Sequence, residues 1–410
     1  MSLVIRNARV LTLAGDRPRR GRALGDLGVL ERADVALEGD RIREVSRGIP
    51  APGVPGAREM DAAGRVLMPA FVDCHTHACW AGSRVDEWDR KLQGVTYLEL
   101  LRAGGGIMST VRAVRAAGEA ELAGLLGSRL TQMARAGTLA AEVKSGYGLT
   151  LEHELKMLRV IRSVLTSPPP HLFPSSVVPT ALLGHALDPD TPGFVDRTIN
   201  ETLPAVSREF PGITLDAFCE QSAWSLADTV RLLSSARELG HPVRVHADQF
   251  NSLGMIPEAI RLNARSVDHL EASTPADIDL LAASNTFGVI LPACGFHLDG
   301  RYAGARRFVD AGGLLALATN FNPGSAPTPS VPMAIALAVR HCGLSPAEAI
   351  SAATLNAAAL LGLHDRGQIS PGQRADLILL RHTDERMLAY EFGADPIDAV
   401  IRSGTVINGA

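Results

Sequence analysis

The stretch RVLMPAFVDCHTH, residues 65–77, joins an apolar run to two histidines that stand two positions apart. An uninterrupted apolar run of this length is typical of a strand buried on both faces. Alternate residues of an extended chain point to the same side, so His75 and His77 can face one metal ion. A histidine pair on its own is equally typical of a core or a surface, so the rest of the chain has to decide.

The middle of the chain repeats this pattern of an apolar run that ends in polar residues. Further strands are expected in TLAAEVKSGYG (138–148), SSVVPTALLGHA (175–186), ITLDAFCE (213–220), PVRVHADQ (242–249), ARSVDHLE (264–271), FGVILPACG (287–295) and LLALATN (314–320). Amphipathic stretches of helical length, such as 120–137 and 225–240, separate most of them. Eight strands in this alternation predict an α/β fold, a parallel sheet closed into a (β/α)8 TIM barrel. An open doubly wound sheet is the alternative, but no G-x-G-x-x-G follows an early strand.

Both ends of the chain differ from the middle. Residues 1–64 and 365–410 contain short strand patterns broken by turns rich in glycine and proline. We predict that the two ends pair into one small β domain, outside a barrel formed by residues 65–364.

Composition limits the classes of function. The 410 residues carry a formal net charge of −4, without a basic stripe, which argues against a nucleic-acid partner. The N-terminus lacks the features of a signal peptide, and no apolar run approaches the ~20 residues of a membrane span. Five scattered cysteines without CxxC spacing do not indicate disulfides. We therefore expect a soluble cytoplasmic protein that does not enter a membrane.

Reactive side chains follow the ends of the predicted strands. In a (β/α)8 barrel these ends form one face, and that face carries the active site. The residues expected to meet there are His75, His77, Lys144, Tyr147, His185, His246, His269 and Asn320. Histidines end later strands as they end the first one, which favours a metal site over a chance pair. Three imidazoles and a water molecule around one ion make a Lewis acid and a source of hydroxide near neutral pH.

Several motifs together resemble one family. PAFVDCHTH, AGSR, EVKSGYGLTLEHELKMLRVIR, HADQ, DHLE, FNPGS and RGQISPGQRADLILL cover nearly the whole chain, and they are similar to motifs of the imidazolonepropionases, members of the amidohydrolase superfamily. The resemblance implies a distorted barrel with a small β-sandwich made from both termini, one Zn2+ or Fe ion, and a homodimer. It also implies hydrolysis of 4-imidazolone-5-propanoate to N-formimidoyl-L-glutamate in histidine degradation.

The resemblance assigns roles to individual residues. It implies His75, His77, His246 and Asn320 as metal ligands, and Arg84, Tyr97, Tyr147, His185, Gln249, Asn322, Gly324 and Ser325 as substrate-binding residues. In catalysis, His269, Asn320 and Gln249 would act, His269 by orienting the water, by polarising the carbonyl or by supporting another ligand. An arginine fork binds a carboxylate with two hydrogen bonds, which suits Arg84 to the propanoate. Without the resemblance, Arg84 would count as a solvated charge, and a half-buried packing role for Tyr147 would stand equal to a substrate-binding one.

Two positions leave alternatives open. Lys144 ends a strand, as the carboxylated lysine of two-metal amidohydrolases does, but it lies inside the KSGYG motif, so we favour one ion. The family has Asp where this chain has Asn320, and an amide can offer an oxygen to a metal but cannot act as a base at pH 7. An impaired enzyme, a different base such as His269, and a non-catalytic barrel protein are all compatible with this change. Another mononuclear amidohydrolase or deaminase is the remaining alternative, although a neutral purine or pyrimidine would have no use for Arg84.

Overall fold

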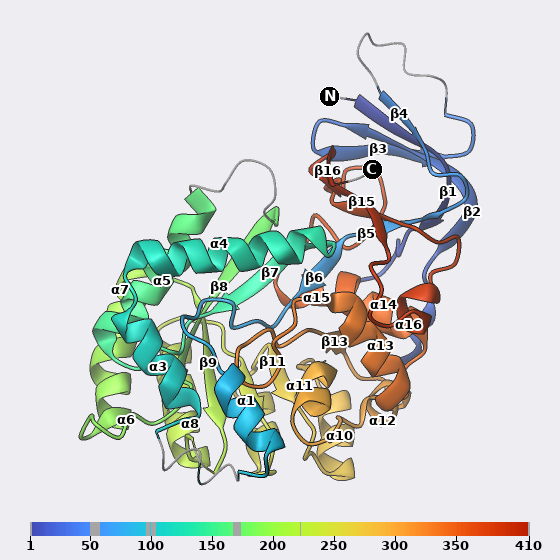
Figure 1. Ribbon diagram of the computed structural model, residues 1–410. Helices are drawn as coiled ribbons and strands as arrows, with labels where there is room; N and C mark the ends of the chain where they lie inside the picture. The colour runs from blue at the N-terminus through green and yellow to red at the C-terminus, as the bar shows by residue number, and fades with distance from the viewer. Residues whose placement is uncertain are drawn as a thin grey trace.

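Two eight-stranded sheets organise the molecule. The computed structural model describes residues 2–49, 58–95, 99, 104–166, 174–221 and 223–408. Among these residues, one sheet is wholly parallel and is surrounded by helices, and the other is built from both ends of the chain (Figure 1). The two termini lie close together on the second sheet, at the upper right of Figure 1.

The parallel sheet follows chain order. In the described part of the chain its strands are β6 (Phe71–Asp73), β7 (Thr138–Lys144), β8 (Ser176–Gly184), β9 (Thr214–Cys219), β10 (Val245–Ala247), β11 (Ser266–His269), β12 (Phe287–Ile290) and β13 (Leu315–Leu317). A parallel bridge between Thr76 and Phe321 joins the chain just beyond β6 to the chain just beyond β13. The sheet thus closes at its carboxyl edge, and the predicted (β/α)8 barrel is confirmed.

Helices connect the barrel strands and cover their outer side. The described helices are α1 (Val85–Leu92), α3 (Ile107–Ala116), α4 (Glu119–Arg135), α5 (Leu151–Thr166), α6 (Phe194–Arg197), α7 (Leu203–Glu209), α8 (Leu226–Glu238), α9 (Met255–Arg261), α10 (Pro275–Ala282), α11 (Pro292–His297), α12 (Ala305–Asp310), α13 (Val331–His341), α14 (Pro346–Ser351), α15 (Ala357–Leu360) and α16 (Met387–Tyr390). Their starts follow local chemistry: Thr274 and Asp277 form a reciprocal capping box before α10, and Ser225 caps α8.

The terminal sheet has its own apolar core. Its described strands are β1 (Ser2–Leu11), β2 (Val29–Glu38), β3 (Arg41–Ser46), β4 (Arg58–Asp61), β5 (Val66–Pro69), β14 (Leu377–Leu380), β15 (Ile397–Arg402) and β16 (Thr405–Asn408). Buried side chains from both ends of the chain, such as Ile5, Val35, Leu377 and Ile401, pack into one cluster. The predicted pairing of the two ends is therefore confirmed.

The stretch 65–77 forms two strands, so its prediction as a single strand was wrong. The backbone N–H of Ala70 donates to the carbonyl of Asp376 beside the terminal sheet, whereas the N–H of Phe71 donates to Gly137 beside the barrel. β5 therefore pairs with β1 and β14, and β6 pairs with β7. The domain limits at 64 and 364 stay predictions, but this pairing places residues 66–69 in the terminal sheet.

Two expectations from composition concern cysteines and membranes. All five cysteines are buried and free. Among the described residues, no helix has the length and apolar content needed to span a bilayer. The cytoplasmic location and the homodimer stay predictions.

Candidate metal centre and substrate pocket

Three histidines converge at the carboxyl face of the barrel. His75 and His77 follow β6, and His246 lies in β10. Nε2 of His77 lies 3.3 Å from Nε2 of His75 and 3.4 Å from Nε2 of His246. Ligand nitrogens about 2.0–2.1 Å from a tetrahedral ion stand about 3.4 Å apart. Each of these two distances is that of a pair of ligands on one ion, and His75 and His246 also form a group with His269 whose ligand atoms lie within 4.8 Å of one another.

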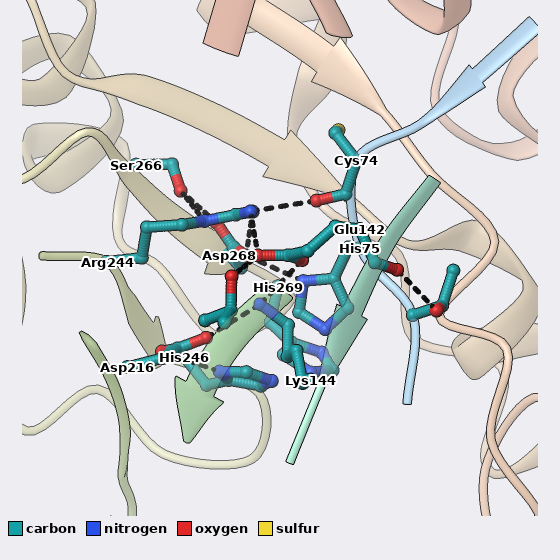
Figure 2. Close-up of polar contacts among 12 residues, drawn as sticks. Cys74, His75, Glu142, Lys144, Asp216, Arg244, His246, Ser266, Asp268 and His269 are labelled. Atoms are coloured by element: carbon teal, nitrogen blue, oxygen red, sulfur yellow. Dashed lines mark hydrogen bonds and ion pairs between the residues drawn. The ribbon is translucent and has the colours of Figure 1, made fainter. Parts of the chain in front are cut away.

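Carboxylates orient two of these imidazoles (Figure 2). Oδ2 of Asp268 lies 2.6 Å from Nδ1 of His75, and Oδ1 of Asp216 lies 3.1 Å from Nδ1 of His246. An ionised carboxylate only accepts, so each Nδ1 carries the proton and each Nε2 keeps its lone pair. Burial lowers the pKa of all three imidazoles, which are therefore neutral near pH 7.

The arrangement fits a bound cation. The Nε2 atoms of His75 and His246, each with an unprotonated lone pair, both face Nε2 of His77. A proton on Nε2 of His77 could be donated to only one of these two atoms. Among the described residues, the buried Nδ1 of His77 has no hydrogen-bond partner. Neutral imidazole nitrogens directed at one point are the donor set that transition metals prefer. The residues present therefore fit the ion that the sequence predicted.

A chain of five buried charges, the buried charge layer, lies behind the histidines. Nζ of Lys144 lies 2.7 Å from Asp216 and 2.8 Å from Glu142. The guanidinium of Arg244 donates to Glu142 and to Asp268, each at 2.6 Å. The layer holds three carboxylates and two cations, and its two end carboxylates are those that hold the imidazoles. Lys144 is committed to ion pairs, which supports a single ion over a bridged pair.

Two adjoining cavities lie in front of the histidines. The smaller, about 60 Å³, is lined by His77, Tyr147, His185, Phe218, His246, Gln249, His269, Asn320, Asn322 and Ser325. The larger, about 640 Å³, shares Tyr147, His185, Gln249, Asn322 and Ser325 with it and adds Arg84 and Gly324. The predicted substrate residues thus lie between the predicted metal ligands and the open pocket.

Glu154 of α5 shapes the loop that carries Tyr147. Its carboxylate accepts hydrogen bonds from three backbone N–H groups of residues 146–149, at 2.7 to 3.0 Å. The carbonyl of Gly146 in turn accepts from Nδ1 of His185 at 2.9 Å. This bond fixes the His185 tautomer and leaves its Nε2 as an acceptor. Glu154 therefore sets the positions of two predicted substrate residues.

Arg84 lies between α1 and the turn after β13. It pairs with Glu87 at 2.7 Å, and its buried Nε has no hydrogen-bond partner among the described residues. A Cβ added to Gly324 would lie 3.2 Å from Nη1 of Arg84, so a larger residue there would require the guanidinium to shift slightly. The guanidinium can therefore bind an anion beside the turn.

The turn after β13 is held by its own amides. Asn322 accepts from the N–H groups of Gly324 and Ser325, each at 2.8 Å, and donates to the carbonyl of Asn320 at 2.6 Å. The side chain of Asn322 therefore stabilises the turn as well as lining the cavities. Asn320 has a φ of +58°, and its Nδ2 donates to Ser325, so its Oδ1 is the atom that it can offer to a metal.

Comparison with known proteins identifies the family. The model of the Amidohydrolase family matches residues 66–407. The chain is 41% identical to the imidazolonepropionase of Herpetosiphon aurantiacus over 417 residues, covering 98% of this chain and 96% of the relative. It is 43% identical to that of Deinococcus radiodurans over 388 residues, covering 94% and 95%. The chain belongs to the imidazolonepropionase family of amidohydrolases.

Solved structures agree on the fold. A 5-methylcytosine deaminase from Klebsiella pneumoniae superposes with a TM-score of 0.74 at 17% identity, covering 100% of this chain and 98% of the other. At this identity the likeness concerns the barrel and the terminal sheet alone. Amidohydrolases are typically metal-dependent, which agrees with the histidine-rich site of this imidazolonepropionase family member.

His269 lies beside the three histidines under backbone strain. Its φ is +94° and that of Leu270 is +74°, values that L-residues adopt only when surrounding structure holds them. Burial alone would lower the pKa of His269, but Glu271 at 3.3 Å and Cys294 together raise it to about 10. His269 therefore carries a proton near pH 7.

The structure brings together every predicted site residue that it describes. Tyr97 lies outside the described residues, and its role stays a prediction. Sequence reasoning missed the buried charge layer and Glu154, which contact the predicted residues from behind. A signal was present: Glu142, Asp216, Arg244 and Asp268 each interrupt an apolar strand, and a charge buried in a strand requires partners.

Proposed function

We propose that the protein hydrolyses 4-imidazolone-5-propanoate to N-formimidoyl-L-glutamate with the help of one zinc or iron ion. Relatives that share about 40% of its residues over nearly the whole chain are imidazolonepropionases. The observation that carries the proposal is the convergence of three imidazole Nε2 atoms, 3.3 and 3.4 Å apart, beside a pocket that contains Arg84.

His75, His77 and His246 would hold the ion, with Oδ1 of Asn320 as a fourth donor. Imidazole ligands suit zinc and iron alike. When bound, the ion supplies a Lewis acid and lowers the pKa of a water molecule. Asp268 and Asp216 keep the ligand histidines in the tautomer that leaves Nε2 free, and the buried charge layer keeps these carboxylates in place.

The pocket residues would orient the substrate through its carboxylate and its ring. Arg84 suits the propanoate because a guanidinium binds a carboxylate with two parallel hydrogen bonds. Burial raises the pKa of Tyr147 well above its usual value, so its hydroxyl stays protonated and donates. Burial also lowers the pKa of His185 to about 3, so its Nε2 stays an acceptor for a ring N–H. The substrate ring would therefore contact one hydrogen-bond donor, Tyr147, and one acceptor, Nε2 of His185.

Proton transfer is the weak step. Ring opening adds the oxygen of water to the ring carbonyl carbon, breaks the adjoining C–N bond and moves a proton to the leaving nitrogen. Asn320 cannot accept that proton, and His269, already protonated, is suited to donate a hydrogen bond to the carbonyl oxygen. We infer an imidazolonepropionase whose rate is limited because it lacks a carboxylate base at position 320.

The test compares the protein with its Asn320→Asp variant in hydrolysis of 4-imidazolone-5-propanoate, with bound metal measured in both. The backbone at Asn320 is left-handed, a region that Asp tolerates as Asn does, so the fold should be kept. Restoring a general base should raise kcat by roughly 10²–10⁴ at equal metal content. Asn263→Asp is the matched control, because Asn263 is exposed and has a similar φ of +54°.

Each outcome decides a different point. Equal rates in both proteins would place the proton acceptor elsewhere. No turnover by either metal-loaded protein would overturn the substrate assignment, and activity on a neutral purine or pyrimidine would favour a deaminase instead.

A further inference from the structure

A second group of metal-ligand atoms lies beside the three-histidine site. His269 ends β11, Glu271 follows two residues later, and Cys294 lies in α11. One ligand atom from each lies within 4.8 Å of the other two. The side chains of His269 and Glu271 are 3% and 4% exposed, and Cys294 is 2% exposed, so all three are shielded from water.

The His269–Glu271 contact is too long for a strong ion pair. Nδ1 of His269 lies 3.4 Å from Oε1 of Glu271 and 3.3 Å from Oε2. A charge-assisted N–H···O bond closes to about 2.7–2.9 Å, whereas N and O ligands on one tetrahedral ion stand about 3.3–3.4 Å apart. Buried Oε2 of Glu271 forms no hydrogen bond with any described residue. The cluster therefore contains a carboxylate oxygen that could bind a metal ion and that accepts no hydrogen bond.

The sulfur of Cys294 accepts a hydrogen bond from a neighbouring side chain. Nε2 of Gln249 donates to Sγ of Cys294 at 3.2 Å. An N–H group directed at sulfur stabilises a thiolate, which is the form that binds metals. A thiolate, an imidazole and a carboxylate form a set that zinc and cadmium favour over magnesium and calcium.

We propose that His269, Glu271 and Cys294 form a second cation site, which takes a thiophilic divalent ion such as Zn2+ or Cd2+. Binding would replace two protons, one on Nδ1 of His269 and one on the thiol, and both would leave to solvent. His269 also lines the cavity in front of the metal centre, and an ion on its Nδ1 leaves the ring with the Nε2–H of a neutral imidazole in place of an imidazolium. Occupancy therefore replaces the imidazolium that the proposed function uses as a hydrogen-bond donor, a consequence that rests on the proposed function, whereas binding itself does not.

The test measures ligation directly. The full chain is loaded with one equivalent of Zn2+ and titrated with Cd2+ while the ultraviolet thiolate-to-cadmium charge-transfer band and the bound metal per chain are followed. Cys294→Ser and Glu271→Gln each remove one ligand atom at nearly constant volume. Cys342→Ser is the matched control, because Cys342 is also buried and free but lies at the end of α13, outside the cluster.

The proposal predicts two ions per chain and a charge-transfer band in the unaltered protein and in Cys342→Ser. It predicts one ion in Glu271→Gln, and one ion with no band in Cys294→Ser. A single ion and no band in the unaltered protein at excess Cd2+ would overturn it, and so would a band that persists in Cys294→Ser. Failure of the proposed function would appear as absent turnover with these binding results unchanged.

Discussion

Ion pairs of nearly equal length occur in two different environments in this molecule. In the barrel, Arg244 pairs with Asp268 at 2.6 Å, and both side chains are at most 2% exposed. On the terminal sheet, Arg9 pairs with Glu31 at 2.5 Å, but the Glu31 side chain is 72% exposed. Water screens the second pair and not the first. The distance between two charged groups therefore does not by itself determine how strongly an ion pair stabilises the structure. The buried pair is the one that can hold a metal ligand in place.

The largest effect is expected from breaking the buried pair. Asp268→Ala leaves the Arg244 guanidinium buried without one of its carboxylates, a loss of about 3–5 kcal/mol. It also frees Nδ1 of His75, so the protein should bind its metal less tightly. Denaturant unfolding and metal content measure the two effects. Glu31→Ala is the surface counterpart and should cost no more than about 1 kcal/mol; similar losses in both variants would contradict the comparison.

Arg84 belongs to a half-buried pair for which a role in substrate binding is proposed. Its side chain is 12% exposed, and that of its partner Glu87 is 14% exposed. Arg84→Leu should lower kcat/KM roughly 10- to 150-fold. This range corresponds to the loss of a hydrogen bond to a charged group, which contributes about 1.5–3 kcal/mol. Arg84→Lys keeps the charge but loses the fork, so it should recover only part of the rate. Arg90→Leu, on the exposed side of α1, is the control, and an equal loss there would argue against carboxylate recognition by Arg84.

Glu154 tests a buried carboxylate that is held by backbone N–H groups. Glu154→Gln places an amide NH2 against these donors, which should cost about 1–3 kcal/mol of stability. Because the loop 146–149 carries Tyr147, kcat/KM should fall while metal content stays the same. Glu152→Gln, exposed on the same helix, should leave both quantities unchanged. Loss of metal in Glu154→Gln would instead assign this residue to the metal centre.

The smallest effect is expected at Asp34 on the terminal sheet. Burial alone would raise its pKa, but N–H groups of Asn7 and Ile49 and the Arg6 guanidinium lower it below 3.8. A carboxyl with a lowered folded-state pKa stabilises the protein above its unfolded value and loses that contribution as pH falls through the folded value. Asp34→Asn should therefore flatten the loss of stability below about pH 4. An unchanged acid slope in unfolding experiments would contradict this assignment.

The fold was predictable because the buried strands of the barrel occur in the sequence as nearly continuous apolar runs. Seven of the predicted apolar runs lie on β7 to β13, because strands covered on both faces contain few polar residues. The break between β5 and β6 was not predictable. It depends on where two adjacent N–H groups find acceptors, at Asp376 and Gly137, and neither residue is near in sequence.

The candidate site was predictable where the proposed ligands end strands and unpredictable where their partners come from other strands. His75, His77 and His246 could be found from spacing and strand ends. Their carboxylate partners stand out in the sequence only as charges within apolar strands, and which histidine each one contacts could not be predicted, because Asp268 is 193 residues from His75. The same holds for Cys294 and His269, which follow different strands and share no motif.

The most direct test of the account is a crystal structure of the metal-loaded protein with anomalous data collected at the absorption edge of the metal. We expect an ion bound by the Nε2 atoms of His75, His77 and His246, with Lys144 still paired with Glu142 and Asp216. An anomalous peak away from these three nitrogens, or a Lys144 that has left its ion pairs to bind metal, would contradict it.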